Sequence, residues 1–398
     1  MTRALALLVL GAHAGGVLLC AAAPVNRTTQ HGFAAASSSS AAAASSAAFA
    51  RRYGPSSGCG LEPPYVPGGE RESLSVDVEI DGLQRNYLLH LPTSYDRERP
   101  TPLIMSFHGW SMSAQNNWNW MGFKEVVEAE NFIIVHPNGI RDCLGQQNCW
   151  SSWNAMGCSN NTADAPQGWT CAPSTSNCQA CAESCQPLGL CNSQQQRNCN
   201  WCTCVDDVSF VSALLDQLEA KLCVDRARVF ASGESLGGLM AFEVGTKLAD
   251  RFAAVAPTVG APLVGFDVPP AGTHQISFLS LWGRNDNVIP PGGGQSNDGW
   301  FYVGVDDYSD TWATYNSCNG AQREWENPVG SGPGNTNLNC VMHRGDCEAP
   351  GTDVVHCAFQ GNHFSQINGY FGRLAYDFFE RHPKTPEWWQ EHRKMSPM

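Results

Sequence analysis

The sequence is poor in charged residues, and above all in basic ones. Asp, Glu, Lys and Arg make up 15% of the 398 residues, and 24 basic side chains stand against 37 acidic ones. The resulting net charge of -13 should repel phosphate backbones and anionic lipid surfaces. We therefore exclude nucleic acid as a partner of this chain.

Long apolar runs are absent after the N-terminal segment. The first run, Ala4 to Cys20, follows Arg3 and is followed by Ala21 to Ala23. A basic start, a short apolar stretch and small residues are typical of a cleaved signal peptide, and the glycines within the run argue against a retained anchor. We predict that residues 1–23 direct secretion and that the mature chain has no stable membrane association. Asn26 and Asn160 begin glycosylation sequons.

Acidic residues are missing from the first sixty positions. No Asp or Glu precedes Glu62, and residues 34–50 are almost wholly Ala and Ser. Such a segment has too little apolar bulk to form a core, so we predict a flexible linker over residues 24–69. An acid-free, Ala/Ser-rich stretch behind a signal also resembles a plastid-targeting leader, which is the alternative to secretion.

Cysteine, by contrast, is abundant. Removal of Cys20 with the signal leaves 17 of 18 cysteines, and 11 of these lie between Cys143 and Cys204. This segment has no helical or strand period, and export oxidises thiols, so we predict a disulfide-stapled insertion over residues 143–204. The alternative is zinc bound by its closely spaced cysteines. Because 11 is odd, one cysteine of the insertion pairs outside it or stays unpaired.

Short apolar runs and helical patterns alternate along residues 70–383. Nearly continuous apolar runs suit strands that are buried on both faces of a parallel sheet, and the spacing over Phe210–Leu222 predicts a helix between two of them. The sequence therefore predicts one α/β domain over residues 70–383, with a mostly parallel, doubly wound sheet and a tail over 384–398. The predicted strands are Ser75–Ile80, Tyr87–Leu91, Leu103–Phe107, Phe132–Val135, Val229–Ala231, Ala253–Ala256, Phe278–Trp282 and Val354–Val355.

The strongest chemical signal is the segment Gly233-Glu234-Ser235-Leu236-Gly237. It matches G-x-S-x-G between a predicted strand and a predicted helix, which is the context that makes this pattern specific. The tight turn requires residues without side chains at Gly233 and Gly237 and forces the serine outward. Because the hydroxyl lies at a helix N-terminus, developing negative charge is favoured there. The sequence thus predicts Ser235 as a nucleophile.

A serine hydroxyl needs a base, and the base needs an orienting acid that precedes it in this chain order. Asp286 lies in a polar turn directly after the strand Phe278–Trp282. The rivals Asp298, Asp306 and Asp307 lie farther from any strand end. We therefore favour Asp286 as the acid.

Three histidines follow the acid in the required order. His356 lies inside an apolar run, which favours a sheet position, and His343 precedes it. His363 follows Gly361-Asn362 in a loop after the last strand, from which a side chain can reach the serine. We favour His363 as the base and predict that a terminal helix begins at Phe364.

An oxyanion hole is the remaining requirement of acyl transfer. One donor should be the amide of Leu236, which follows the nucleophile. The loop after Leu103–Phe107 begins His108-Gly109-Trp110, and we predict that the Trp110 amide is the second donor. We expect His108, Gly109, Trp110 and Glu234 to line the substrate site.

With these motifs the sequence resembles the secreted polyhydroxybutyrate-depolymerase and feruloyl-esterase group of α/β-hydrolases. The resemblance runs from about Leu88 to Phe379 and includes the His108-Gly109 loop, the Ser235 turn and the surroundings of Asp286 and His363. It implies hydrolysis of feruloyl or acetyl polysaccharide esters, or of hydroxyalkanoate polyesters, through an acyl-enzyme and without a metal or other cofactor. Leu236, where the family often has a smaller or polar residue, and the long insertion bear on substrate choice.

Two other functions remain open on the sequence. A hydrolase-like fold can serve as an extracellular binding protein, although a binder needs no Ser, His and Asp set. The same three residues also serve serine peptidases, and only the resemblance favours esters over amides.

Overall fold

The computed structural model describes residues 45–69, 73–75, 79, 82–143, 149–156, 182–187, 202–266, 275–297, 299–330, 337–348, 351–365, 367 and 369–386. Contacts divide the chain into Met1–Ala43 and Ala44–Met398, and all the described residues belong to the second unit. The predicted signal peptide, both sequons and most of the predicted insertion lie outside the described residues. Within the described ranges, no helix has the length and apolar character needed to cross a membrane.

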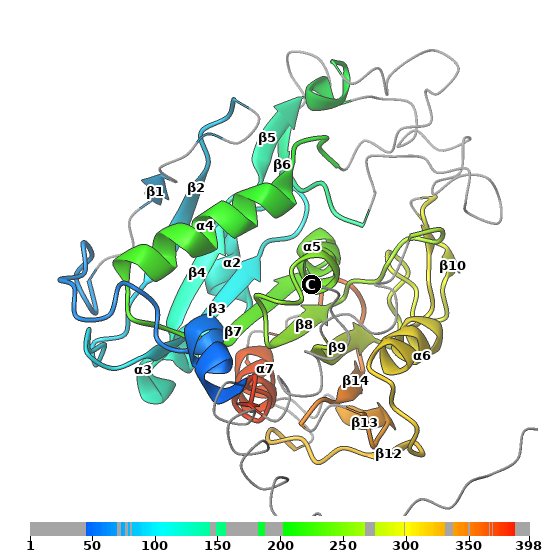
Figure 1. The fold of residues 1–398 in the computed structure, drawn as a ribbon. Coiled ribbons are helices and arrows are strands. Elements are labelled where there is room, and N and C mark those ends of the chain that lie inside the picture. Colours follow the sequence, from blue (N-terminus) through cyan, green and yellow to red (C-terminus); the bar gives the residue numbers. More distant parts are fainter. Residues whose placement is uncertain are drawn as a thin grey trace, which may run out of the picture. The chain divides into compact units, whose positions relative to one another are not determined.

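Ten strands of the described chain form one sheet, in the order β1-β2-β4-β3-β7-β8-β9-β14-β13-β12 (Figure 1). The six strands from β4 to β14 in this order are parallel, and the pairs at both edges are antiparallel. The strands are β1 (Ser73–Ser75), β2 (Asn86–His90), β3 (Thr101–Phe107), β4 (Ile133–Pro137), β7 (Val224–Glu234), β8 (Ala254–Thr258), β9 (Ser277–Gly283), β12 (Arg323–Glu324), β13 (Asn339–Arg344) and β14 (Val354–Phe359). The α/β-hydrolase fold predicted from the sequence is confirmed.

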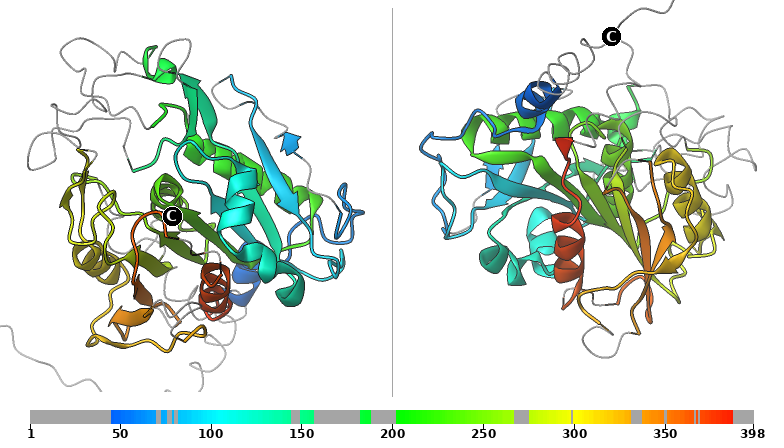
Figure 2. Two further views of the ribbon diagram at one scale, coloured as in Figure 1. Left: turned by 180° about the vertical axis from the view of Figure 1, so that it is seen from behind. Right: turned by 60° about the horizontal axis from the view of Figure 1, so that its bottom comes forward.

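Helices cover both faces of this sheet (Figure 2). Leu103 and Met105 of β3 contribute to one core and Ile104 to the other, because successive side chains of a strand point to opposite faces. The first core includes side chains of α4 (Asp207–Lys221), α5 (Leu236–Lys247) and α6 (Val305–Tyr315). The second includes side chains of α2 (Ala114–Trp120), the turn η1 (Phe123–Glu125), α3 (Val127–Glu130) and α7 (Phe371–Glu380). Two-sided burial explains why the parallel strands appear in the sequence as continuous apolar runs.

Four short strands and one turn of the described chain lie outside the ten-stranded sheet. β5 (Ile140–Cys143) and β6 (Cys149–Ser152) form one hairpin, and β10 (Gly294–Gln295) pairs with β11 (Phe301–Tyr302). The turn η3 (Glu183–Cys185) belongs to the described part of the Cys-rich insertion.

The terminal helix begins later than the sequence predicts, at Phe371 instead of Phe364. The Asn362 side chain accepts a hydrogen bond from the Phe364 amide, and the Asn362 amide donates to Ser365 Oγ. These side-chain bonds hold the backbone in a turn, which competes with helix formation. His363 is therefore held in a structured loop rather than at a helix N-terminus.

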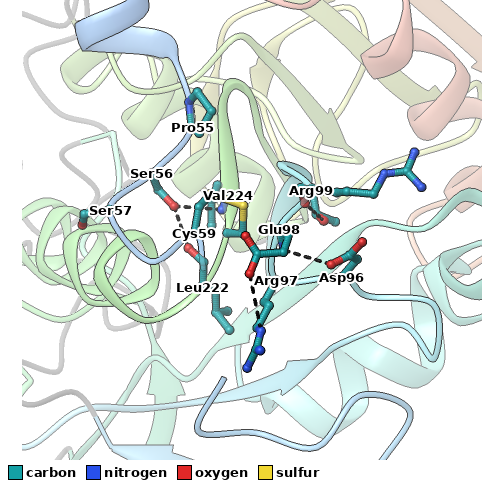
Figure 3. The surroundings of a disulfide bond; sticks show 12 residues. Pro55, Ser56, Ser57, Cys59, Asp96, Arg97, Glu98, Arg99, Leu222 and Val224 are labelled. Carbon is teal, nitrogen blue, oxygen red and sulfur yellow. Dashed lines mark hydrogen bonds and ion pairs between the residues drawn. A yellow bond between two sulfur atoms is a disulfide. The ribbon is translucent and has the colours of Figure 1, made fainter. Parts of the chain in front are cut away.

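The linker predicted over residues 24–69 is wrong for its last part. Residues 45–53 form a helix that ends at the buried Tyr53, and Ser56 Oγ donates to the Leu222 carbonyl and accepts from the Val224 amide. Figure 3 shows the segment beside β7, where Cys59 forms a disulfide with Cys223. This cross-link closes a loop of 164 residues, and in the chain-entropy model such a loop stabilises the fold by about 5 kcal/mol.

The predicted C-terminal limit of the domain, at residue 383, is also too early. Lys384 is 4% exposed, and its Nζ donates to the Ala249 carbonyl. Its backbone amide donates to the Ala227 carbonyl. The chain is thus part of the packed unit beyond the predicted boundary.

The six cysteines outside the insertion pair with one another. Besides Cys59–Cys223, the pairs are Cys318–Cys347 and Cys340–Cys357. In the described part of the insertion the pairs are Cys143–Cys149 and Cys185–Cys204. For these residues disulfides, and not zinc, are confirmed. None of the six outer cysteines remains to pair with the insertion.

Candidate active site

Ser235 lies at the turn between β7 and α5, with φ of 53° and ψ of -121°. A side chain is rarely held at positive φ, and such strain is found mainly at functional sites. A Cβ on Gly233 would lie 2.1 Å from the Gly237 carbonyl oxygen, and one on Gly237 would lie 2.2 Å from the Phe107 carbonyl oxygen. Both contacts are with backbone, so only glycine fits beside this serine.

The structure brings His363 and Asp286 to this serine from the ends of two other strands. Asp286 follows β9, and His363 follows β14, the next strand in the sheet. His363 Nε2 is 2.9 Å from Ser235 Oγ, and His363 Nδ1 is 2.8 Å from Asp286 Oδ2. The side chain of Asp286 is 1% exposed and that of His363 is 7% exposed.

Backbone amides determine how the Asp286 carboxylate is oriented. The amides of Val288 and Ile289 donate to Asp286 Oδ1 at 2.9 and 2.8 Å. The other oxygen then accepts the Nδ1–H of His363. The lone pair of the neutral imidazole is therefore on Nε2 and faces the serine hydroxyl, which is the arrangement that a general base requires.

The alternative candidates for the acid and the base that the structure describes do not line the Ser235 pocket. Asp306 and Asp307 are exposed in the first turn of α6, and Asp298 lies outside the described residues. His343 Nε2 is 2.9 Å from Asp310, and His356 is buried on β14.

His108 does not line the substrate site, so this part of the prediction is wrong. The residue is fully buried, and burial lowers the pKa of its imidazole to about 4. Its Nδ1 donates to the Gly109 carbonyl, its Nε2 accepts from the Gly139 amide, and its own carbonyl accepts from Trp153 Nε1. The neutral His108 thus ties the loop after β3 to the two neighbouring loops.

The pocket beside Ser235 has a volume of about 460 Å³ and is mainly apolar. The predicted Gly109, Trp110 and Glu234 line it. Leu236 lines a separate, smaller space that Ser235 also lines, and as the first residue of α5 its amide has no acceptor within the helix. The pocket also includes Met112, Trp120, Ser235, Val259, Val288, Asn297, His363 and Phe364.

Known proteins with similar sequences are esterases. The chain is 25% identical over 328 residues to the probable feruloyl esterase C of Aspergillus clavatus, covering 81% of this chain and 88% of that one. It is 26% identical over 335 residues to feruloyl esterase D of Neurospora crassa, covering 82% and 90%. Among solved structures, an acetyl xylan esterase from Aspergillus awamori has a TM-score of 0.47 at 12% identity, over 79% of this chain and 100% of that chain. No protein-family model matches the chain.

The chain is similar to the feruloyl-esterase group of α/β-hydrolases. It is a carboxylic ester hydrolase. The pocket at Ser235 is the site in the described chain where a strained serine, an imidazole and a carboxylate meet. A larger cavity of about 970 Å³ in the esterase is lined by Asp142, Asp207 and Glu243 among others. Neither Ser235, His363 nor Asp286 lines it. Geometry and not size therefore identifies the candidate active site.

Glu234, the neighbour of Ser235, is an unusual acid for this esterase pocket. The residue is 5% exposed, and its Oε1 has no hydrogen-bond partner among the described residues. Burial raises the pKa of its carboxyl to about 8, although a hydrogen bond from the Gly109 amide partly offsets this rise. The side chain is therefore neutral at pH 7 and can accept and donate hydrogen bonds within the pocket.

Proposed function

We propose that the esterase hydrolyses hydroxycinnamoyl esters of polysaccharides through an acyl-enzyme on Ser235. The observation that carries this proposal is the continuous hydrogen-bonded line from Ser235 through His363 to Asp286. Ser235 attacks the ester carbonyl, and His363 Nε2 takes its proton and passes it to the departing alcohol. Water, activated by the same imidazole, then releases the acid and regenerates the serine.

In this mechanism Asp286 keeps the imidazole in the required tautomer and stabilises its cationic form. The amides of Leu236 and Trp110 donate to the oxyanion of the tetrahedral intermediate. The location of Leu236 at the N-terminus of α5 supports its role, since the helix dipole also favours negative charge there. The direct contact of Trp110 with the pocket supports the second assignment.

The character of the pocket supports an aromatic acyl group. Trp110 and Trp120 line it, and Phe364 is 73% exposed at its edge, where it packs edge-on against His363. Trp150 packs against Trp110, with ring centroids 5.2 Å apart. Aromatic walls favour a ferulate ring over a small aliphatic acid. The names of the similar fungal feruloyl esterases support the same class.

We also propose that the esterase acts outside the cell. Its confirmed disulfides support this location, because such bonds persist in oxidising compartments.

The experiment that tests the proposal compares four substrates at equal enzyme concentration. These are methyl ferulate, a hydroxybutyrate oligomer, a short-chain nitrophenyl ester and a ferulate amide. We expect methyl ferulate to have the highest kcat/KM. Preference for the oligomer would point to polyester as the substrate, and preference for the amide would point to a peptidase. Failure to cleave any of the four would favour the binding-protein function.

We predict that the ionisation of Glu234 limits activity at alkaline pH. As the pH rises through about 8, the carboxyl loses its proton and places a negative charge beside the developing oxyanion. The kcat/KM of the wild-type enzyme should then fall by roughly three- to tenfold between pH 7 and pH 9.5. In Glu234→Gln, which cannot ionise, this fall should disappear in a pH–rate profile.

Glu243→Gln is the matched control for this prediction. Glu243 is half-buried, and desolvation raises the pKa of its carboxyl, but it lies on α5 and does not line the Ser235 pocket. Its variant should keep the wild-type alkaline limb. An unchanged limb in Glu234→Gln would assign the fall to another group.

A further inference from the structure

Three side chains that take no part in the proposed reaction meet near the edge of the sheet. Asp306 comes from the first turn of α6, His343 from β13 and His356 from β14. Their ligand atoms all lie within 4.8 Å of one another. None of the three lines the pocket at Ser235.

The backbone holds the two histidines rigidly. β13 and β14 are antiparallel, and Cys340 and Cys357 are both register partners and a disulfide pair. The register shifts between Met342 and Arg344, so His343 lies at an irregularity of the strand. Such irregularities redirect a side chain, and here His343 comes beside His356, with ring centroids 5.5 Å apart.

The hydrogen bond of His343 determines which of its nitrogens is available. His343 Nε2 is 2.9 Å from Asp310 Oδ1, and the same carboxylate oxygen forms an ion pair with Arg344. An ionised carboxylate only accepts hydrogen bonds, so Nε2 carries the proton and Nδ1 carries the lone pair. Nδ1 is buried and, among the described residues, has no partner.

His356 presents a second nitrogen of the same kind. The residue is 6% exposed, and its buried Nε2 also has no partner within the described part of the chain. Buried polar atoms usually have a hydrogen-bond partner, and these two nitrogens lie in one cluster with the Asp306 carboxylate, where a ligand could take both.

The chemistry of the donor set selects the ligand. Two imidazoles and one carboxylate are a typical donor set for Zn²⁺, whereas Ca²⁺ and Mg²⁺ prefer oxygen donors alone. The contact between Asp310 and the far nitrogen of His343 is the carboxylate–histidine arrangement that orients zinc ligands in other proteins. We propose that Asp306, His343 and His356 bind one Zn²⁺ ion, with water as the fourth ligand.

A metal ion here would join α6 to the hairpin of β13 and β14. β14 ends at Phe359, directly before the loop that carries His363. Because the ion would bind the folded state and not the unfolded chain, its effect is on stability, and it takes no part in the ester chemistry.

The test measures zinc binding to the intact secreted protein after treatment with a chelator. Isothermal titration with ZnCl₂ should give one ion per chain, saturating zinc should raise Tm by about 3 °C or more, and Co²⁺ should give the absorption bands of a tetrahedral site. His343→Gln should weaken zinc binding at least tenfold. Asp306→Asn should weaken it as well, while the adjacent Asp307→Asn, also exposed on α6, should bind like the wild type.

Hydrolysis of a nitrophenyl ester by each variant verifies that the fold is intact. The proposal is overturned if micromolar zinc does not bind stoichiometrically. It is equally overturned if His343→Gln binds zinc as tightly as the wild type, because the ion would then occupy another place, such as a free cysteine or the imidazole of His363.

Discussion

Replacement of Ser235 by alanine should lower kcat for methyl ferulate by at least about 10⁵-fold. The change removes the only atom that can form the acyl-enzyme in the proposed mechanism, and losses of this size follow removal of the nucleophile in other serine hydrolases. The remaining rate should come from the oxyanion donors and from substrate binding. Stopped assays with a sensitive product readout are needed to measure it.

The fold should survive this substitution, because alanine is smaller than serine and keeps the same backbone connection. Circular dichroism and Tm should therefore match the wild type within experimental error. A fluorophosphonate probe should label the wild type at Ser235 and leave Ser235→Ala unlabelled. Retention of most of the activity would exclude Ser235 as the nucleophile and with it the proposed mechanism.

The parts of this fold that the sequence predicts well are those with a local physical cause. Strands buried on both faces are apolar at most positions, so β3, β4, β8 and β9 are visible as short, nearly continuous apolar runs. The turn at Ser235 admits only glycine at two positions, and this need is also visible locally. The fold and the candidate nucleophile therefore follow from short stretches of sequence.

The features that short stretches of sequence do not predict depend on contacts between residues that lie far apart in the chain. The helix over residues 45–53 and the link from Cys59 to Cys223 join segments 164 positions apart, and nothing in the Ala/Ser-rich stretch indicates that pairing. His108 was expected near the substrate because of its place after β3. Its ring instead turns inward, because backbone groups of Gly109 and Gly139 satisfy both nitrogens.

The proposed zinc site also depends on residues that lie far apart in the sequence. Among short sequence patterns, only the closely spaced cysteines suggest metal binding. His343 and His356 are 13 positions apart on antiparallel strands, and Asp306 comes from a helix before both. The register partner of His356 is Val341, and His343 lies in the irregularity between Met342 and Arg344. The sequence does not show this irregularity, which brings the two histidines together.

Replacement of Asp286 by asparagine should lower kcat by about 10⁴-fold while changing the shape of the site very little. The reason lies in the two amides of Val288 and Ile289 that donate to Asp286 Oδ1. They require an acceptor, so the carbonyl oxygen of the asparagine takes this place and its NH₂ group must face His363. The histidine then accepts at Nδ1 and carries its proton on Nε2. An imidazole in this tautomer cannot take the proton of Ser235.

The tautomer of His363 distinguishes this explanation from a simple loss of the negative charge of Asp286. Nitrogen NMR of labelled protein should show the His363 proton on Nδ1 in the wild type and on Nε2 in Asp286→Asn. Asp307→Asn removes a carboxylate from the exposed turn of α6 and should keep both the wild-type rate and the wild-type tautomer. A large fall in kcat with the proton still on Nδ1 would mean that Asp286 acts through its charge on the imidazolium and not by selecting the tautomer. A fall of less than tenfold would remove Asp286 from the mechanism altogether.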